Sequence, residues 1–194
     1  YTRQQMIRSD FNVADVYDLG ALLRFKEGSA DWLVAAYAGP LTDEPGTIGP
    51  RLLIFMRKCR FLLYLNPTTL ETEAKKELPG AIGCTARRSV QTCGNFVAWL
   101  SDQGVQLADL GRELALLTAT KPLSSDIQDV INRINWQYAG NAVAAYHNNR
   151  YHLAVPLDGS TVNNATLVFN FLNTSDDSPW GEWESVDFYP GDFD

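Results

Sequence analysis

Short apolar runs recur along most of the chain, each six to nine residues long and flanked by glycine, proline, asparagine or aspartate. Runs of this length, rich in aliphatic, aromatic and β-branched residues and bounded by turn residues, are typical of β-strands. They lie at 32–38, 51–57, 60–65, 95–100, 150–157, 165–172 and 180–188. The pattern predicts a chain that is mostly β, with a further strand at 21–25.

Two pairs of runs are predicted to form tight hairpins. Ser101-Asp102-Gln103-Gly104 separates a strand at 95–100 from one at 104–108. His147-Asn148-Asn149-Arg150 separates a strand at 141–146 from one at 150–156. Both links contain glycine or asparagine, which tolerate the left-handed backbone that a tight hairpin turn needs.

One helix interrupts the strands, and we place it near residues 125–136. Ser125 is a candidate N-cap, with Gln128 three residues later as the second member of a capping box. Apolar residues then follow at helical spacing and would form a single stripe. The stripe consists of Ile127, Val130, Ile131 and Ile134. This segment is therefore expected to be a short amphipathic helix.

The predicted strands fall into three sets of about four, over residues 32–77, 84–118 and 141–188. The second set has its strands at 84–90, 95–100, 104–109 and 113–118. The sets begin at intervals of 52 and 57 residues, and four-stranded propeller blades repeat at about 40–50 residues. The predicted fold class is all-β, with β-propeller-like blades of four antiparallel strands that form an incomplete ring in one domain, 1–194. A twisted β-sandwich is the alternative.

Composition narrows the classes of partner. The chain has 194 residues, with 16 Lys and Arg against 23 Asp and Glu, which gives a net charge of −7. A net-acidic domain is poorly suited to hold nucleic acid through its phosphates. No stretch approaches the roughly 20 apolar residues of a membrane helix, so no membrane-spanning segment is expected. The opening Tyr1-Thr2-Arg3 lacks an initiator Met and a signal peptide, as expected for a fragment or a processed chain.

The acidic residues are concentrated toward one end. Residues 151–194 contain eight Asp and Glu and no Lys or Arg. The nearest basic cluster comprises Arg51, Arg57, Lys58 and Arg60. Opposite charges of this kind attract neighbouring copies of a chain, and an acidic surface also repels a polyanion. A solvated acidic tail is the alternative.

Candidate catalytic and metal-binding residues are few. The histidines His147 and His152 could join Asp158 around a metal, but no further ligand lies at a suitable spacing. Cys59, Cys84 and Cys93 are an odd, sparse set, expected to be buried reduced thiols of a protein made in a reducing cytosol. None is predicted at a helix N-terminus, where a thiolate is stabilised. We therefore expect no catalytic residue, no metal and no cofactor.

One pair of carboxylates supports an alternative function. Glu182 and Glu184 alternate with Trp180 and Trp183 in a predicted strand. Glycosidases use two carboxylates, and tryptophan rings stack on sugars. The alternative is therefore a carbohydrate-binding or glycoside-hydrolysing β-propeller, while the Asp-box-like turn 101–104 lacks the aromatic residue that sialidases place after it.

The order of several segments resembles a known family. Leu52-Leu53-Ile54-Phe55-Met56-Arg57-Lys58-Cys59-Arg60-Phe61 comes first, followed by 83–90, 97–105, 149–156, 163–170 and the acidic strand after Trp180. This order resembles the β-propeller portion of tail structural proteins of tailed phages, notably the tail nozzle (tail tubular protein B) of short-tailed phages. The resemblance covers roughly residues 20–190, and complete members of the family are several times longer.

The resemblance implies a virion structural protein that is not an enzyme. Nozzle proteins form rings, usually hexameric, at the end of the tail, where they contact other tail and adaptor proteins after assembly in the host cytoplasm. The genome passes through the ring without being specifically bound. An acidic lining suits this passage, because like charge prevents tight phosphate contacts. A structural propeller of cellular origin is a third interpretation with the same fold.

Overall fold

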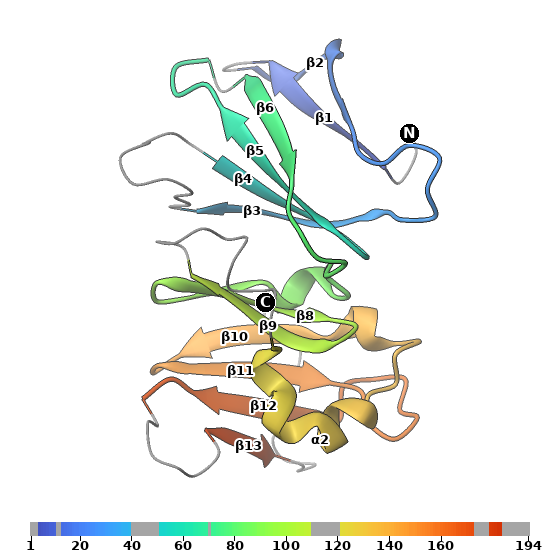
Figure 1. Cartoon of the computed structure of the whole chain (residues 1–194), viewed down its shortest axis with the longest axis vertical. Coiled ribbons are helices and arrows are strands. Elements are labelled where there is room, and N and C mark those ends of the chain that lie inside the picture. The colour runs from blue at the N-terminus through green and yellow to red at the C-terminus, as the bar shows by residue number, and fades with distance from the viewer. Residues whose placement is uncertain are drawn as a thin grey trace.

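The computed structural model of the chain describes residues 4–10, 13–39, 51–69, 71–109, 121–172 and 179–183 (Figure 1). Within these residues the chain is mostly β, and every strand pair is antiparallel, as predicted. The helical segments are short. They are η1 (Arg87–Ser89), η2 (Leu123–Ile127), α2 (Gln128–Asn132) and η3 (Ala139–Asn141).

Four sheets follow one another along the sequence, each built from strands that are consecutive in the chain. The first is the hairpin of β1 (Gln5–Asp10) and β2 (Val13–Arg24). The others have the orders β3-β4-β5-β6, β7-β8-β9 and β10-β11-β12-β13. Their strands are β3 Leu33–Gly39, β4 Arg51–Met56, β5 Arg60–Leu65, β6 Thr72–Glu77, β7 Gln91–Cys93, β8 Phe96–Ser101, β9 Gly104–Asp109, β10 Val143–His147, β11 Arg150–Val155, β12 Ala165–Asn170 and β13 Trp180–Trp183.

Two of the three predicted strand sets are confirmed as four-stranded sheets. Both predicted hairpins are also confirmed, because Ser101 pairs with Gly104 and His147 with Arg150. The predicted strand at 21–25 belongs to the longer β2, and β1 was not predicted. The predicted strand at 113–118 and the end of the strand at 180–188 lie outside the described residues.

The strand predicted at 84–90 is wrong. This stretch forms a short extended segment and then the 3₁₀ turn η1. The buried Ser89 hydroxyl donates to Ala86 O (2.7 Å) and accepts from Leu100 N (2.9 Å). A serine that satisfies backbone groups in this way favours a turn over a strand ladder. The first strand of the third sheet is instead the short β7.

The predicted helix is present but shorter, and its capping box is wrong. The residue before α2 is Ile127, and no side chain caps either helical segment. The Ser125 hydroxyl lies 3.3 Å from Asp126 Oδ1 instead. The predicted apolar stripe is confirmed, with Ile131 and Ile134 buried and Ile127 and Val130 packed on the same cluster. Burial of the stripe therefore places this segment, without help from an N-cap.

Each sheet packs on the next through a separate apolar cluster. Alternate residues of a strand point to opposite faces, and β4 shows the consequence. Ile54 contributes to the cluster that contains Phe25, beside the first sheet, whereas Phe55 faces Trp99 of the third sheet. The third sheet also packs on the fourth, through Leu100 and Leu153 among others. The described residues thus form four sheets in series, not the two of a sandwich.

The sheets fan out from their first strands. In Figure 1, β3 and β10 lie toward the middle of the molecule, and the last strands β6 and β13 lie toward its two ends. Side chains link the first strands across the sheets. The Tyr37 hydroxyl lies 2.9 Å from Thr92 Oγ1, and Gln91 Nε2 donates to Ala144 O (2.8 Å). The strands β3, β7 and β10 carry no Asp, Glu, Lys or Arg, whereas β6 has the sequence TEAKKE and is almost fully exposed.

Candidate functional site

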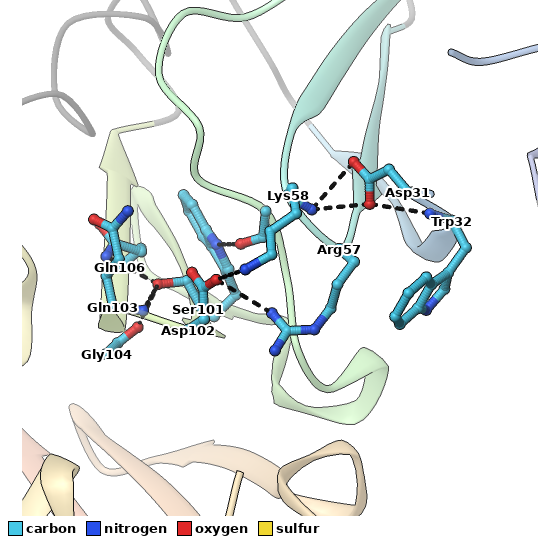
Figure 2. A network of polar contacts seen from close by, with 11 residues as sticks. Asp31, Trp32, Arg57, Lys58, Ser101, Asp102, Gln103, Gly104 and Gln106 are labelled. Carbon is cyan, nitrogen blue, oxygen red and sulfur yellow. Dashed lines mark hydrogen bonds and ion pairs between the residues drawn. The ribbon is translucent and has the colours of Figure 1, made fainter. Parts of the chain in front are cut away.

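The turn between β4 and β5 is fixed by a carboxylate from the segment before β3 (Figure 2). Asp31 accepts hydrogen bonds from Lys58 N, at 3.1 and 3.2 Å, and from Trp32 N, at 3.0 Å. The thiol of Cys59 also donates to Asp31 Oδ2, at 3.4 Å. A carboxylate that accepts several such bonds holds the turn in a single conformation.

Asp102, in the turn between β8 and β9, connects this turn to the third sheet. Its Oδ2 atom accepts from Lys58 Nζ and lies 3.7 Å from Arg57 Nη1 (Figure 2). The side chain of Lys58 is 59% exposed, whereas those of Arg57 and Asp102 are 17% and 21% exposed. One carboxylate thus holds two cations, and one of these ion pairs is largely shielded from water.

Ser101 shapes the turn that carries Asp102. Its hydroxyl donates to Gly104 O (2.9 Å) and accepts from Gln103 N (3.1 Å) and from Gln106 Nε2 (3.1 Å). Both Ser101 and Gln106 are buried. We call the set of Asp31, Arg57, Lys58, Ser101 and Asp102 the turn network.

The buried layer beside the turn network is aromatic and cationic. Trp99 is fully buried, and its Nε1 donates to Gly83 O (3.0 Å). The guanidinium of Arg60 lies 5.4 Å from the centre of the Trp99 ring and donates to Pro79 O (3.1 Å). Burial lowers the pKa of Arg60 to about 10, so it stays charged at neutral pH. A cation on an indole face is attracted by the ring quadrupole, which offsets part of its desolvation.

The helical segment η2, which precedes α2, contacts β9 of the third sheet. Ser124 is buried, and its hydroxyl accepts from Val105 N (2.9 Å). A Cβ atom on Gly104 would lie only 2.3 Å from Ser124 Oγ, and Gly104 has a φ of +112°. Only glycine combines this backbone conformation with so close an approach. The turn carrying Asp102 is therefore held from both sides.

The arrangement is that of a structural junction. The two carboxylates of the turn network accept hydrogen bonds from backbone N–H groups, a thiol and a cationic side chain. No group of three or more His, Cys, Asp or Glu among the described residues is arranged to hold a metal. These contacts connect the β4–β5 turn to the segment before β3 and to the third sheet.

The prediction that the basic residues at 51–60 form a surface cluster is wrong. Arg51 and Arg60 are 4% and 0% exposed, and Arg51 lies over the ring of Tyr64. The strands β4 and β5 bury these side chains between sheets, because they lie on faces that pack on a neighbour. Only Lys58, with Arg57 beside it, reaches the surface.

The histidines do not converge on a metal site. His147 is exposed at the end of β10, while His152 is half-buried in β11. Burial lowers the pKa of His152, and Arg150 and His147 add to this shift. Asp158 pairs with Arg133 (Nη2 to Oδ2, 2.7 Å), and this contact lowers its pKa.

All three cysteines are buried and unpaired with one another, as predicted. They belong to three different junctions between sheets, with Cys59, Cys84 and Cys93 each in a separate apolar cluster. Burial raises the pKa of each thiol to about 12. Their thiolate population at neutral pH is therefore very small, and thiolates are the reactive form.

Trp180 lies in the core, which removes it from the predicted carbohydrate site. It is 9% exposed, its Nε1 donates to Leu123 O (3.1 Å), and its ring is 5.0 Å from that of Phe169. A ring held in this way offers no open face to a sugar. Of the other predicted residues, Glu182 and Trp183 are described only as backbone of β13, and Glu184 lies outside the described residues.

Sequence reasoning missed Asp31 and the role of Asp102. Asp31 precedes a strand and shows no spacing to the turn that it binds, 27 residues later. The sequence places Asp102 only in a hairpin turn that faintly resembles an Asp box. The one local signal is the adjacent pair Arg57 and Lys58 in the turn before β5, because a cation that becomes largely buried is usually paired.

No helix among the described residues is long and apolar enough to cross a membrane. Neither a scan against protein-family models nor a search of the curated proteins finds a match to this chain. The geometry of the sheets and of the turn network therefore carries the functional argument.

Proposed function

We propose that this chain is a non-enzymatic structural protein of a phage tail, similar to the nozzle at the tail end. In this proposal its sheets are propeller-like blades, and several copies form part of an oligomeric ring for genome passage. The protein would assemble in the host cytoplasm, contact other tail or adaptor proteins and reside in the virion.

The observation that carries the proposal is the serial packing of antiparallel sheets in sequence order. Two complete four-stranded meanders flank a third sheet, whose two faces are both buried by its neighbours. Propellers are built by repeating four-stranded sheets in this manner. Sheets packed in series in this way suit a subunit of an assembly.

The fan of the sheets supports a blade-like interpretation over flat layers. Small or uncharged residues occupy the first strands, where the sheets come together through Tyr37, Thr92 and Gln91. Farther out, the helical segment with Ile131 and Ile134 fills the space between the third and fourth sheets. Blades that radiate from an axis need little filling where they meet and more filling farther out, because the gap between them widens with distance from the axis.

The chain order also limits where an acidic lining can lie. The first strand of the fourth sheet, β10, carries no carboxylate, whereas Glu182 lies in β13, the strand at the opposite edge. In this proposal an acidic channel wall would lie at the β13 edge of the fourth sheet, away from the first strands. That edge would face the central axis of the ring of subunits. Changing Glu182 and Glu184 to Lys is expected to impair ring assembly or genome delivery, and unchanged infectivity would contradict this placement.

Labelling of particles tests the proposed function directly. Antibodies raised against the purified chain should decorate the tail end of phage particles from the source of this sequence, viewed by negative-stain electron microscopy. Particles lacking the protein should adsorb poorly or fail to deliver DNA. Purified particles free of the protein, together with its presence in the cell lysate, would overturn the proposal.

A further inference from the structure

Three basic side chains share one face of the fourth sheet at the end of the β10–β11 hairpin. His147 and Arg150 lie directly opposite each other in the register, on either side of Asn148 and Asn149, which both have positive φ. Residues opposite each other in an antiparallel pair point to the same face, as do alternate residues of one strand. His152 therefore belongs to this face as well. We call His147, Arg150 and His152 the basic tip.

No carboxylate of the described residues neutralises the basic tip. His147 and Arg150 are exposed, and neither forms an ion pair or a hydrogen bond with another described side chain. The neighbours that the register places on the same face are Val168 and Asn170 of β12 and Gly181 of β13, all uncharged. The tip is thus a local positive charge on a chain of net charge −7.

The arrangement becomes unfavourable once the imidazoles are protonated. Like charges directly opposite each other destabilise a sheet, and protonation near pH ~6.5 adds a charge at each histidine beside Arg150. The pKa of His152 reflects this repulsion, because burial lowers it most and Arg150 and His147 lower it further. An anion bound at the tip would relieve the repulsion.

The charge of the tip favours a carboxylate over other ligands. Arg150 stays protonated and would repel a metal ion, whereas a guanidinium pairs with a carboxylate through two hydrogen bonds. A nucleic acid or an anionic membrane extends its negative charge over a long distance, so the net charge of −7 opposes its approach. A short acidic segment of a protein meets less of this repulsion.

We propose that the basic tip binds an acidic segment of a partner protein, and that this binding tightens as the pH falls. The spacing suits an extended segment. Diagonal neighbours such as His147 and His152 are about 7–8 Å apart on an antiparallel pair, and carboxylates two residues apart in an extended chain are about 7 Å apart. The inference goes beyond the proposed function and does not depend on it.

Peptide binding to the intact chain, measured by fluorescence polarisation, tests the proposal. The probe is a labelled peptide of alternating glutamate and glycine, and the control peptide has glutamine in place of glutamate. We expect the glutamate peptide to bind about tenfold more tightly at pH 5.5 than at pH 8, because this is the factor gained when a bound anion raises an imidazole pKa by about one unit. The glutamine peptide should bind weakly at both pH values.

Variants of the tip separate its charges. Arg150→Gln should weaken binding of the glutamate peptide at least about tenfold at both pH values. His147→Gln with His152→Gln should keep the affinity at pH 8 and abolish the increase at pH 5.5. The matched control, Lys76→Gln, removes an exposed cation from β6 and should change neither. Because His152 is half-buried, thermal unfolding checks each variant, and His147→Gln alone should reduce the increase if the double variant does not fold.

Three results would overturn the proposal. The first is equal affinity for the glutamate and glutamine peptides, and the second is a pH effect that survives in the double histidine variant. The third is binding of single-stranded DNA but not of the glutamate peptide, lost in Arg150→Gln, which would identify phosphate as the ligand.

Discussion

The third sheet packs on the second sheet and on the fourth sheet, and these two junctions contain different kinds of side chains. Toward the second sheet, the contact is direct, with Phe55 and Trp99 at a centroid distance of 5.1 Å and the fully buried Arg60 beside them. At the edge of this contact, charged side chains of the turn network link the second sheet to the third. We call this the charged junction.

Toward the fourth sheet, a helical segment lies between the strands, and its apolar stripe supplies much of the core. The polar contacts there are neutral. Tyr151 donates to Ser89 O (2.8 Å), Gln91 donates to Ala144 O (2.8 Å), and Ser124 accepts from Val105 N (2.9 Å). We call this the neutral junction.

The difference shows that one kind of sheet can be stacked in two ways. The charged junction has little space, so it needs a glycine at 83 and a cation placed over an indole ring. The neutral junction has more space, and the helical segment fills it. Charge is therefore expected to matter for the first junction and packing volume for the second, which makes the two separable by mutation.

Truncating a large buried side chain in each junction should have the largest effects. Trp99→Ala is expected to lower the free energy of unfolding by about 3–5 kcal/mol, and Ile131→Ala by about 2–5 kcal/mol. Trp99→Ala should fall near the top of its range, because it also uncovers Arg60, a buried cation. Equilibrium unfolding in urea measures both. A cost for Trp99→Ala below that for Trp99→Phe would contradict this view of the charged junction.

The two glycines at close contacts form the next pair. A Cβ atom on Gly83 would lie 2.3 Å from the backbone of the β4–β5 turn, which cannot move without breaking the turn network. On Gly104 it would meet the Ser124 hydroxyl. We expect Gly83→Ala to cost about 3 kcal/mol and Gly104→Ala about 2 kcal/mol. Adding Ser124→Ala should recover part of the second cost and none of the first, as a double-mutant cycle would measure.

The strands and their antiparallel order could be predicted because alternating or continuous apolar runs and turn residues are local signals. The same signals failed at residues 84–90, where alternating buried residues end in a serine that bonds to a neighbouring strand. The capping box failed for a related reason, since packing of the apolar stripe decides where α2 begins. Local patterns thus predict elements well until a tertiary contact competes with them.

The site was much less predictable than the fold. The sequence places Asp31, Lys58 and Asp102 far apart, and no pattern at fixed spacing links them. Arg51 and Arg60 looked like surface cations because burial of a charge depends on the neighbouring sheet, which the local sequence does not describe. A residue type alone says little about a junction between sheets.

Alkaline pH should weaken the neutral junction more than the charged one. Burial raises the pKa of Cys84 and Cys93 to about 12, and it raises the pKa of Tyr151 well above its usual value. Unfolding restores ordinary values, so the unfolded state loses these protons first and stability falls as pH rises above about 9. Each thiol contributes a slope of about 1.4 kcal/mol per pH unit at most.

Arg60 changes the stability in the opposite direction. Burial lowers its pKa to about 10, so above that pH the folded state releases the proton more readily than the unfolded state, and the stability rises. It therefore offsets part of the loss at the charged junction only. Urea unfolding between pH 8 and 11 should show that Cys93→Ala flattens the fall in stability, and Tyr151→Phe should flatten it further above pH 10. A profile unchanged by both substitutions would refute the assignment.

The smallest effect should come from the ion pairs of the turn network. Asp102→Asn keeps the shape of the side chain and removes the charge shared by Arg57 and Lys58. Because Lys58 is mostly exposed and Arg57 is not, we expect a cost of about 1 kcal/mol, more than the few tenths typical of surface pairs. Asp158→Asn removes an exposed pair with Arg133 near the neutral junction and is the matched control.

The buried thiols show which junction the change affects. Cys84 lies at the charged junction and Cys93 at the neutral one, so their alkylation rates under native conditions report local opening. In Asp102→Asn, Cys84 should react about fivefold faster, which corresponds to about 1 kcal/mol, while Cys93 keeps its rate. Mass spectrometry of iodoacetamide-treated protein resolves the two sites. Equal acceleration at both would mean that the chain opens as a single unit, and the division into a charged and a neutral junction would then have no energetic meaning.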